Sequence, residues 1–181
     1  MGEEIELKFP VEDLAELRGR LLELEAERLS KSQFEDNWVF DRGDELRNLG
    51  CLLRLRLDAD GNGALLTFKG PPRFDEGVKI RTEHETRVED SDAMRSLLEQ
   101  LGYRAVTRYQ KRRETWRLGG IIVVLDNTPM GDYVEFEGDN AAKLSERCGF
   151  TPEDAERRTY LELYSDYRRK HPEAPEEMLL P

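Results

Sequence analysis

Charged side chains alternate with apolar ones in several short segments of this chain. Residues 4–8 read Glu-Ile-Glu-Leu-Lys, so an extended backbone would place Glu4, Glu6 and Lys8 on one face and two apolar side chains on the other. Lys69 ends another extended segment. The same alternation recurs at Arg54 and Arg56, at Lys79, Arg81, Glu83, Glu85 and Arg87, at Lys111 and Arg113, and at Glu135 and Glu137.

Taken singly, each charged face is typical of a strand that is half exposed to solvent. Ordinary solvent faces mix Thr, Ser, Gln and Lys, whereas these faces repeat doublets of Glu and Arg. We therefore expect the charged faces to converge on the interior of a β-barrel whose apolar faces pack outward against helices.

The residue types indicate what that interior would bind. Arg binds phosphate oxygens bidentately and Lys acts as a point charge. A polyphosphate would therefore suit the cluster Lys8, Arg54, Arg56, Lys69, Arg81, Lys111 and Arg113. The pairs Glu4 with Glu6 and Glu135 with Glu137 would repel such a ligand unless a metal ion intervened, and carboxylate oxygens favour Mg²⁺ or Mn²⁺. Because a bridging metal could polarise the phosphoryl group and activate a water, phosphoryl transfer is the predicted reaction class.

Sequence periodicity places these residues in a strand-rich α+β chain. Period-two alternation predicts strands over residues 3–9, 34–41, 50–58, 64–69, 77–89, 104–118, 120–127 and 132–138. Helical spacing predicts helices over residues 11–28, 90–101, 140–148 and 156–169. Ser91 or Asp92 could cap the second helix, and Thr151-Pro152 is a helix-start signal before the last. Tight hairpin turns are expected at residues 60–63 and at Gly119-Gly120, since glycine permits positive φ.

Length and composition bound the remaining possibilities. The 181 residues suit one domain, placed at residues 1–170, followed by a Pro-rich tail at residues 171–181 that we expect to be poorly ordered. The net charge of −11 argues against an extended nucleic acid or an anionic membrane as a partner. The first 25 residues contain no apolar run, so we expect no signal peptide or membrane span there and a cytoplasmic location. Cys51 and Cys148 are expected to be buried free thiols.

The ordered set of motifs resembles the CYTH domain, or triphosphate tunnel metalloenzyme, superfamily. Its amino-terminal Glu-x-Glu-x-Lys is found at residues 4–8, and the agreement continues through Leu-Arg-Leu-Arg at residues 53–56, Lys69, Arg-x-Glu-x-Glu at 81–85, Lys-x-Arg at 111–113, Leu-Asp at 125–126, Gly131 and Glu-x-Glu at 135–137. The resemblance covers roughly residues 3–165 and implies an eight-stranded antiparallel tunnel with a charged interior and helices packed outside. It also implies a triphosphate bound by the basic residues and a divalent metal bound by the glutamates.

The resemblance implies a role for each matching residue. Glu4, Glu6 and Lys8 would be catalytic, and Lys8 would also bind the triphosphate with Arg54, Arg56, Lys69, Arg81, Lys111 and Arg113. Metal would be held by Glu4, Glu6, Glu135 and Glu137. The residues Glu83, Glu85 and Asp126 would complete a second metal site, orient a water or neutralise neighbouring Arg side chains.

Three functions remain open within this resemblance. Hydrolysis of a small-molecule triphosphate needs only a water near the terminal phosphate, whereas adenylyl cyclisation also needs a nucleoside pocket. The sequence gives no signal for that pocket, and Gln33-Phe34 stands where the family's cyclases would show His-Phe, so hydrolysis is favoured. The third function is a non-catalytic polyphosphate-binding or nucleotide-binding module. Outside the resemblance, a different class stays open: a structural or regulatory module that docks a partner through the acidic exterior or the Pro-rich tail. We expect a monomer or a homodimer.

Overall fold

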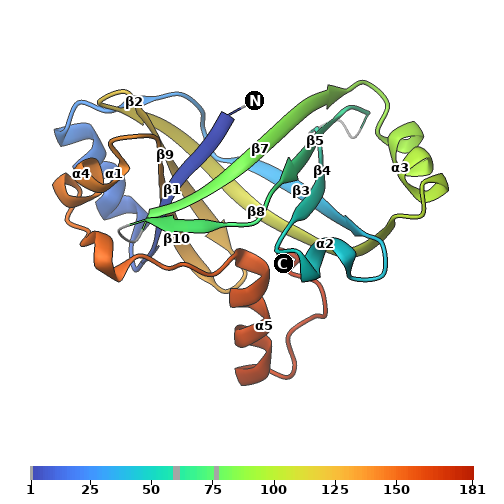
Figure 1. The fold of residues 1–181 in the computed structure, drawn as a ribbon. Helices are drawn as coiled ribbons and strands as arrows, with labels where there is room; N and C mark the ends of the chain where they lie inside the picture. Colours follow the sequence, from blue (N-terminus) through green and yellow to red (C-terminus); the bar gives the residue numbers. More distant parts are fainter. Residues whose placement is uncertain (1, 59–61, 76–77) are drawn as a thin grey trace.

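Eight antiparallel strands close into a barrel in the computed structural model, which describes residues 2–58, 62–75 and 78–181. The strands are β1 (Gly2–Val11), β3 (Gln33–Asp41), β4 (Leu52–Leu57), β5 (Ala64–Lys69), β7 (Val78–Val88), β8 (Arg104–Leu118), β9 (Ile121–Thr128) and β10 (Gly131–Glu137). Around the barrel they follow the order β1-β10-β9-β8-β3-β4-β5-β7, and β7 pairs again with β1 (Figure 1). The predicted α+β barrel fold is confirmed.

Two short strands extend this barrel beyond the predicted set. The strand β2 (Glu27–Arg28) pairs with β8, and β6 (Arg73–Asp75) pairs with the first residues of β7. The segment Gly70-Pro71-Pro72 separates β6 from β5, so β5 and β6 pair in turn with the later and earlier parts of β7. Proline lacks the N–H needed for a continuous ladder, which explains the interruption.

The barrel closes where β1 lies between β10 and β7. Glu6 is opposite Glu137 on one side and Lys79 on the other, and Glu4 is opposite Arg81. Residues directly opposite each other in an antiparallel pair share a face of the sheet. The pairing register therefore gathers the charged parity of each strand on the same side of the sheet.

Helices cover the outside of the barrel. They are α1 (Leu14–Glu23), α2 (Glu45–Asn48), α3 (Ser91–Gln100), α4 (Ala141–Arg147) and α5 (Tyr160–Lys170), with a short 3-10 helix at Pro152–Asp154. Figure 1 shows α1 and α4 together at one end, α3 at the other, and α5 beneath the barrel. The predicted helices at residues 90–101 and 140–148 are confirmed within a residue or two at each end.

Side-chain caps correct three of the expected helix starts. Helix α1 begins after Asp13, whose carboxylate accepts hydrogen bonds from two backbone N–H groups, so it is shorter than residues 11–28. Helix α3 is capped by Asp90 rather than by Ser91 or Asp92. Helix α5 begins at Tyr160 because Thr159 and Glu162 form a capping box, while Pro152 starts only the 3-10 helix.

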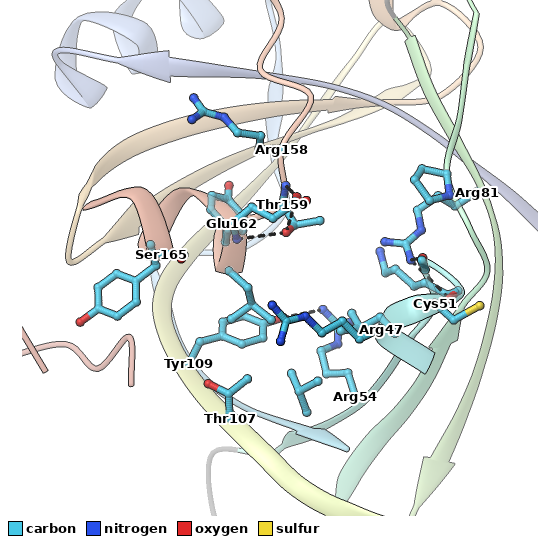
Figure 2. Close-up of a pocket in the computed structure, with 18 of the residues that line it drawn as sticks. Arg47, Cys51, Arg54, Arg81, Thr107, Tyr109, Arg158, Thr159, Glu162 and Ser165 are labelled. Atoms are coloured by element: carbon cyan, nitrogen blue, oxygen red, sulfur yellow. Dashed lines mark hydrogen bonds between the residues drawn. The ribbon is translucent and has the colours of Figure 1, made fainter. Parts of the chain in front are cut away.

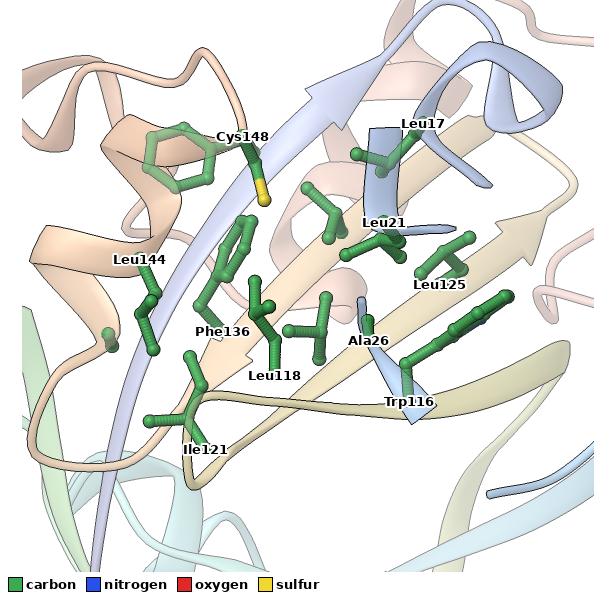
Figure 3. Close-up of a cluster of buried hydrophobic side chains, with 14 of the residues drawn as sticks. Leu17, Leu21, Ala26, Trp116, Leu118, Ile121, Leu125, Phe136, Leu144 and Cys148 are labelled. Carbon is green, nitrogen blue, oxygen red and sulfur yellow. The ribbon is translucent and has the colours of Figure 1, made fainter. Parts of the chain in front are cut away.

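The apolar parity of the strands forms the core outside the barrel. Leu7 and Phe136 from the barrel pack with Leu21 of α1 and Leu144 of α4, and the first three are at most 1% exposed (Figure 3). Full burial of one such side chain contributes about 1.5–3 kcal/mol. The contacts with helices therefore supply the apolar stabilisation, which leaves the interior free to carry charge.

The tail is packed against the barrel, in contrast to the poor order expected from its prolines. Met178 is 1% exposed and pairs with Tyr109 of β8, and its carbonyl accepts a hydrogen bond of 2.7 Å from the Gln110 N–H. The Tyr164 hydroxyl of α5 donates to the carbonyls of Pro175 and Glu177. Composition did not indicate this order because the contacts depend on a single apolar side chain and on backbone groups.

The remaining local expectations have mixed outcomes. Gly119 and Gly120 have φ of +54° and +90° and form the expected turn between β8 and β9. The turn expected at residues 60–63 falls partly outside the described residues, although the strands on either side pair as a hairpin. Cys148 is a buried free thiol, whereas Cys51 is only half-buried. Within the described ranges, no helix is long and apolar enough to cross a membrane.

Candidate functional site

A cavity of about 1550 Å³ occupies the barrel, and α5 forms part of its wall. Its walls carry thirteen Lys and Arg side chains and eleven Asp and Glu side chains, although the whole chain has a net charge of −11. Figure 2 shows Arg54 and Arg81 from the strands on one side, and Thr159, which caps α5, with Glu162 and Ser165 of α5 on the other. Small-molecule sites usually measure about 300–1,000 Å³, so this cavity has room for a polyphosphate and an attached group.

Glu4, Glu6 and Lys8 of β1 all point into this cavity. The Lys69 Nζ donates to Glu4 at 2.5 Å, and the Lys79 Nζ donates to Glu6 at 2.6 Å. The Lys8 Nζ donates to the carbonyl of Arg158, in the loop that precedes α5. Burial lowers the pKa of Lys8. Burial alone would also lower the pKa of Lys69, but Glu4 outweighs that effect and raises it.

Asp126 of β9 anchors the basic residues of β8. One of its oxygens accepts from Arg113 at 2.8 Å, and the other accepts from Lys111 at 2.9 Å, from Arg113 at 2.6 Å and from the Tyr160 hydroxyl at 2.8 Å. Its exposure is 0%. Burial would raise the pKa of this carboxyl, but Arg113 and Lys111 hold it far below its usual range. Of the three roles expected for Asp126, neutralisation of neighbouring basic side chains agrees best with these contacts, because both oxygens accept hydrogen bonds from Lys111, Arg113 or Tyr160.

The other acidic residues meet fewer cations. Glu135 accepts from Arg113 at 2.5 Å, whereas Glu137 is 3.9 Å from the same guanidinium. Burial raises the pKa of Glu137 to about 8, and the negative charge of Glu135 adds to the effect. Burial also raises the pKa of Glu83 to about 7 even though Lys69 lies 3.3 Å away. The cations on this wall therefore do not fully compensate for burial, so Glu137 and Glu83 hold a proton more readily than an exposed glutamate does.

The carboxylates fit a divalent cation by chemistry, although they do not yet surround one point. Among the described residues, no three His, Cys, Asp or Glu side chains form a ready metal site. The Oε2 atom of Glu4 is nevertheless buried without a hydrogen-bond partner in the described part of the chain. Glu137 interacts electrostatically with Glu135, Glu4 and Glu6, so the four expected metal ligands share one region. Hard oxygen donors of this kind suit Mg²⁺ or Mn²⁺.

The remaining basic residues also line the cavity, with different partners. Arg54 donates to the Tyr109 hydroxyl at 3.3 Å and to Thr67 at 3.1 Å, and Arg56 donates to Glu35 at 2.9 Å. Thr67 in turn donates to Glu85 at 2.8 Å. These contacts follow from the register, which places Arg54 opposite Thr67 and Thr67 opposite Glu85.

Arg81 differs from the other expected phosphate ligands. Its guanidinium donates to the carbonyls of Gly70 at 2.7 Å and Gly50 at 3.1 Å rather than to a carboxylate. It therefore also joins the segment before β4 to the segment after β5. Every expected basic residue lines the cavity, as do all the expected glutamates.

Several cavity residues were not among the expected site residues. Lys79 of the cavity wall could have been found, because it lies on the inward parity of its strand. The same holds for Glu35, which does not line the cavity but accepts a hydrogen bond from Arg56. Tyr160 could not have been found, because nothing in the sequence places α5 against the barrel. Its ring lies 4.5 Å from the Lys8 Nζ and 4.9 Å from the Lys111 Nζ, so it contacts two expected phosphate ligands at once.

Residues 2–160 match the family model of the CYTH domain. The chain belongs to the CYTH family. A curated relative from Methanocaldococcus jannaschii, provisionally named an adenylate cyclase, is 31% identical to this CYTH protein over 136 residues, which cover 74% of this chain and 75% of the relative.

Solved structures share the fold of this CYTH protein. A provisionally named adenylate cyclase of Vibrio parahaemolyticus superposes with a TM-score of 0.78 at 24% identity, covering 90% of this chain and 97% of the other. A Hippeastrum protein, provisionally named an adenylyl cyclase and stated to have a dominant triphosphatase activity, superposes with a TM-score of 0.69 at 20% identity. That match covers 91% of this chain and 96% of the Hippeastrum protein. At these identities the two structures support the fold alone.

Proposed function

We propose that this CYTH protein is a divalent-metal-dependent hydrolase of small molecules that carry a triphosphate. The observation that supports the proposal most directly is the ring of inward Lys and Arg side chains paired with carboxylates inside the cavity. A protein with this acidic composition gains nothing in solubility from a buried basic cluster. Binding of a polyanion, whose oxygens replace the carboxylates as partners of these cations, explains why the cavity contains them.

The basic residues that line the cavity are assigned to the phosphate chain by their positions, and Arg81 of β7 belongs to this set. Arg54, Arg56, Lys111 and Arg113 form the wall of β4 and β8, and Lys69 and Lys79 face them from β5 and β7. Lys8 completes the set from β1. Burial lowers the pKa of its ammonium group, and the nearby carboxylates of Glu135 and Glu6 act in the opposite direction by favouring the charged form. Guanidinium groups would bind the phosphate oxygens bidentately and orient the chain along the barrel.

Phosphate binding would also prepare the carboxylates for metal. Without a ligand, Glu4 is paired with Lys69, Glu6 with Lys79 and Glu135 with Arg113. When a triphosphate takes these cations, the three carboxylates and Glu137 become available as ligands of Mg²⁺ or Mn²⁺. A bound ion of this type neutralises phosphate charge and polarises the phosphoryl group. Glu83 and Glu85 are proposed to orient the attacking water.

Hydrolysis is favoured over cyclisation by what the cavity supplies. Hydrolysis requires the phosphate ligands and a water, and this large cavity admits water from its open mouth. The Hippeastrum neighbour's stated triphosphatase activity indicates that this fold accommodates hydrolysis under a cyclase name. The second candidate is adenylyl cyclase, which the name of the Methanocaldococcus relative favours.

The deciding experiment is incubation of the purified protein with Mg²⁺ or Mn²⁺ and, separately, tripolyphosphate, thiamine triphosphate and ATP, with chromatography of every product. Orthophosphate release that requires metal is the expected result. Cyclic AMP with pyrophosphate would establish the cyclase instead. Tight tripolyphosphate binding without any product would leave a binding module and refute the enzyme.

A further inference from the structure

One exposed aromatic ring lies at the wall of the cavity. Among the described residues, Phe34 and Phe74 are the two phenylalanines with large exposure, at 46% and 45%. Phe74 of β6 lines the cavity, whereas Phe34 does not. An aromatic ring left exposed beside a charged cavity has no apolar partner to explain it, so it is available to a ligand.

The strand register directs Phe74 toward the phosphate ligands. Phe74 is directly opposite Lys79 in the β6–β7 pair, and such partners share one face with Cβ atoms about 5 Å apart. The Lys79 side chain points into the barrel, where its Nζ reaches Glu6 at 2.6 Å. Phe74 therefore stands beside a residue proposed to bind phosphate, where the cavity approaches the end of the β6–β7 pair.

The position of Phe74 is fixed by the segment before it. Pro71 and Pro72 precede β6, and both lie within 3.7 Å of the position that a side chain on Gly50 would occupy. Arg81 joins the two sides by donating to the carbonyls of Gly50 and Gly70. Fixed proline φ angles and this double contact limit the movement of β6, so the ring is pre-organised for stacking.

One face of the Phe74 ring already receives a planar group. The Arg157 guanidinium carbon lies 5.7 Å from the ring centroid, in the loop that leads to α5. Arg157 also lines the cavity, so the ring and the guanidinium flank the same opening. Aromatic and guanidinium planes together are the groups on which nucleobases stack.

We propose that Phe74, with Arg157, is the platform that stacks on the flat heteroaromatic group of an organic triphosphate. This inference rests on the proposed function and specifies its substrate class: a triphosphate ester that carries an aromatic ring, rather than inorganic tripolyphosphate. The phosphate chain occupies the barrel between Lys79 and the β8 cations, and the attached ring leaves past Lys79 onto Phe74.

The test compares Phe74→Ala with Phe34→Ala, a matched control of equal exposure that lies away from the cavity. Titration calorimetry of the metal-free proteins would measure affinity for ATP, thiamine triphosphate and tripolyphosphate. Loss of one stacking partner weakens binding by about 5-fold to 100-fold. Phe74→Ala should therefore weaken binding of ATP, thiamine triphosphate or both by this factor, while changing tripolyphosphate affinity less than about twofold. Phe74→Trp should retain the affinity, and Phe34→Ala should change none of the three.

The outcomes separate this inference from the proposed function. Equal changes for the aromatic triphosphates and tripolyphosphate, or no change for any of them, would refute the platform while leaving the triphosphate site intact. Failure of the unaltered protein to bind any triphosphate, either without metal or with Mg²⁺ added, would refute both. The unfolding temperature of each variant shows whether it is folded. Substitution of an exposed side chain on an edge strand should change this temperature by less than about 2 °C.

Discussion

Replacement of Asp126 by Asn should destabilise the protein strongly. Asp126 is fully buried and accepts hydrogen bonds from Lys111, Arg113 and Tyr160. Removing one partner of a buried ion pair costs about 3–5 kcal/mol, because the remaining charges lose compensation. Arg113 would keep Glu135 at 2.5 Å, and Lys111 would keep Glu35 at 3.8 Å, so we expect about 3 kcal/mol, the lower end.

The assay is thermal unfolding followed by circular dichroism. A loss of about 3 kcal/mol should lower the unfolding temperature by about 6–12 °C for a chain of this length. The control is Asp58→Asn, which breaks the mostly exposed pair of Asp58 with Arg87 and should cost less than about 1 kcal/mol. A loss for Asp126→Asn no greater than that of the control would refute the reasoning.

The same variant gives a prediction about pH. The pKa of Asp126 is lower in the folded protein than its unfolded value of about 3.9, so its charge stabilises the fold above that value and the contribution disappears as the pH falls. The stability difference between the unaltered protein and Asp126→Asn should therefore be complete at pH 6–7. It should shrink below about pH 4. A difference that grows in acid would contradict this assignment.

Four further results are expected. Glu6→Gln should reduce metal-dependent phosphate release by at least about 100-fold with an unchanged circular dichroism spectrum, because a proposed metal ligand is lost while the hydrogen-bond acceptor remains; near-normal release would refute the metal role. Arg56→Ala should weaken tripolyphosphate binding by about tenfold or more in calorimetry, since a charge-assisted contact is lost, and unchanged affinity would contradict the assignment. Saturating tripolyphosphate should raise Mn²⁺ affinity by about 5-fold to 150-fold in a titration, because it frees paired carboxylates, and independent binding would refute that coupling. Iodoacetamide at pH 8 should label Cys51 well before Cys148, whose pKa burial raises to about 11, as mass spectrometry would show; the reverse order would be inconsistent with the structure.

The strands and their inward faces could be predicted from the sequence because parity alone determines which side chains share a face. Once residues 4–8 are read as a strand, Glu4, Glu6 and Lys8 must point together. The pairing of a carboxylate with a particular cation could not be predicted in this way. It depends on which strands are neighbours, and β1 meets β7 and β10, which lie far from it in the sequence.

The wall formed by α5 was the part of the site that the sequence did not reveal. The Tyr160 hydroxyl donates to Asp126, and the Arg158 carbonyl accepts from Lys8, but both contacts depend on the path of a loop. The role of Asp126 was open for a related reason. Its motif position suggested several functions, and its four hydrogen bonds, which favour a positioning role over a metal-binding one, depend on contacts between strands that the sequence does not give. Cytoplasmic location, metal identity and oligomeric state stay predictions.

The closure of the barrel by β1 determines when the site can exist during synthesis. Glu6 leaves the ribosome early, yet one of its partner positions in the sheet, Glu137, is made on the order of ten seconds later. Until then the apolar side of β1, with Leu7 and Phe9, cannot pack with Phe136 of β10 or with Leu144 of α4. Folding should consequently be slow, because it depends on long-range contacts. The nascent chain should be most prone to aggregate before β10 emerges from the ribosome. The residues proposed to hold metal also form the last seam to close, so a chain that stalls in folding has no active centre at all.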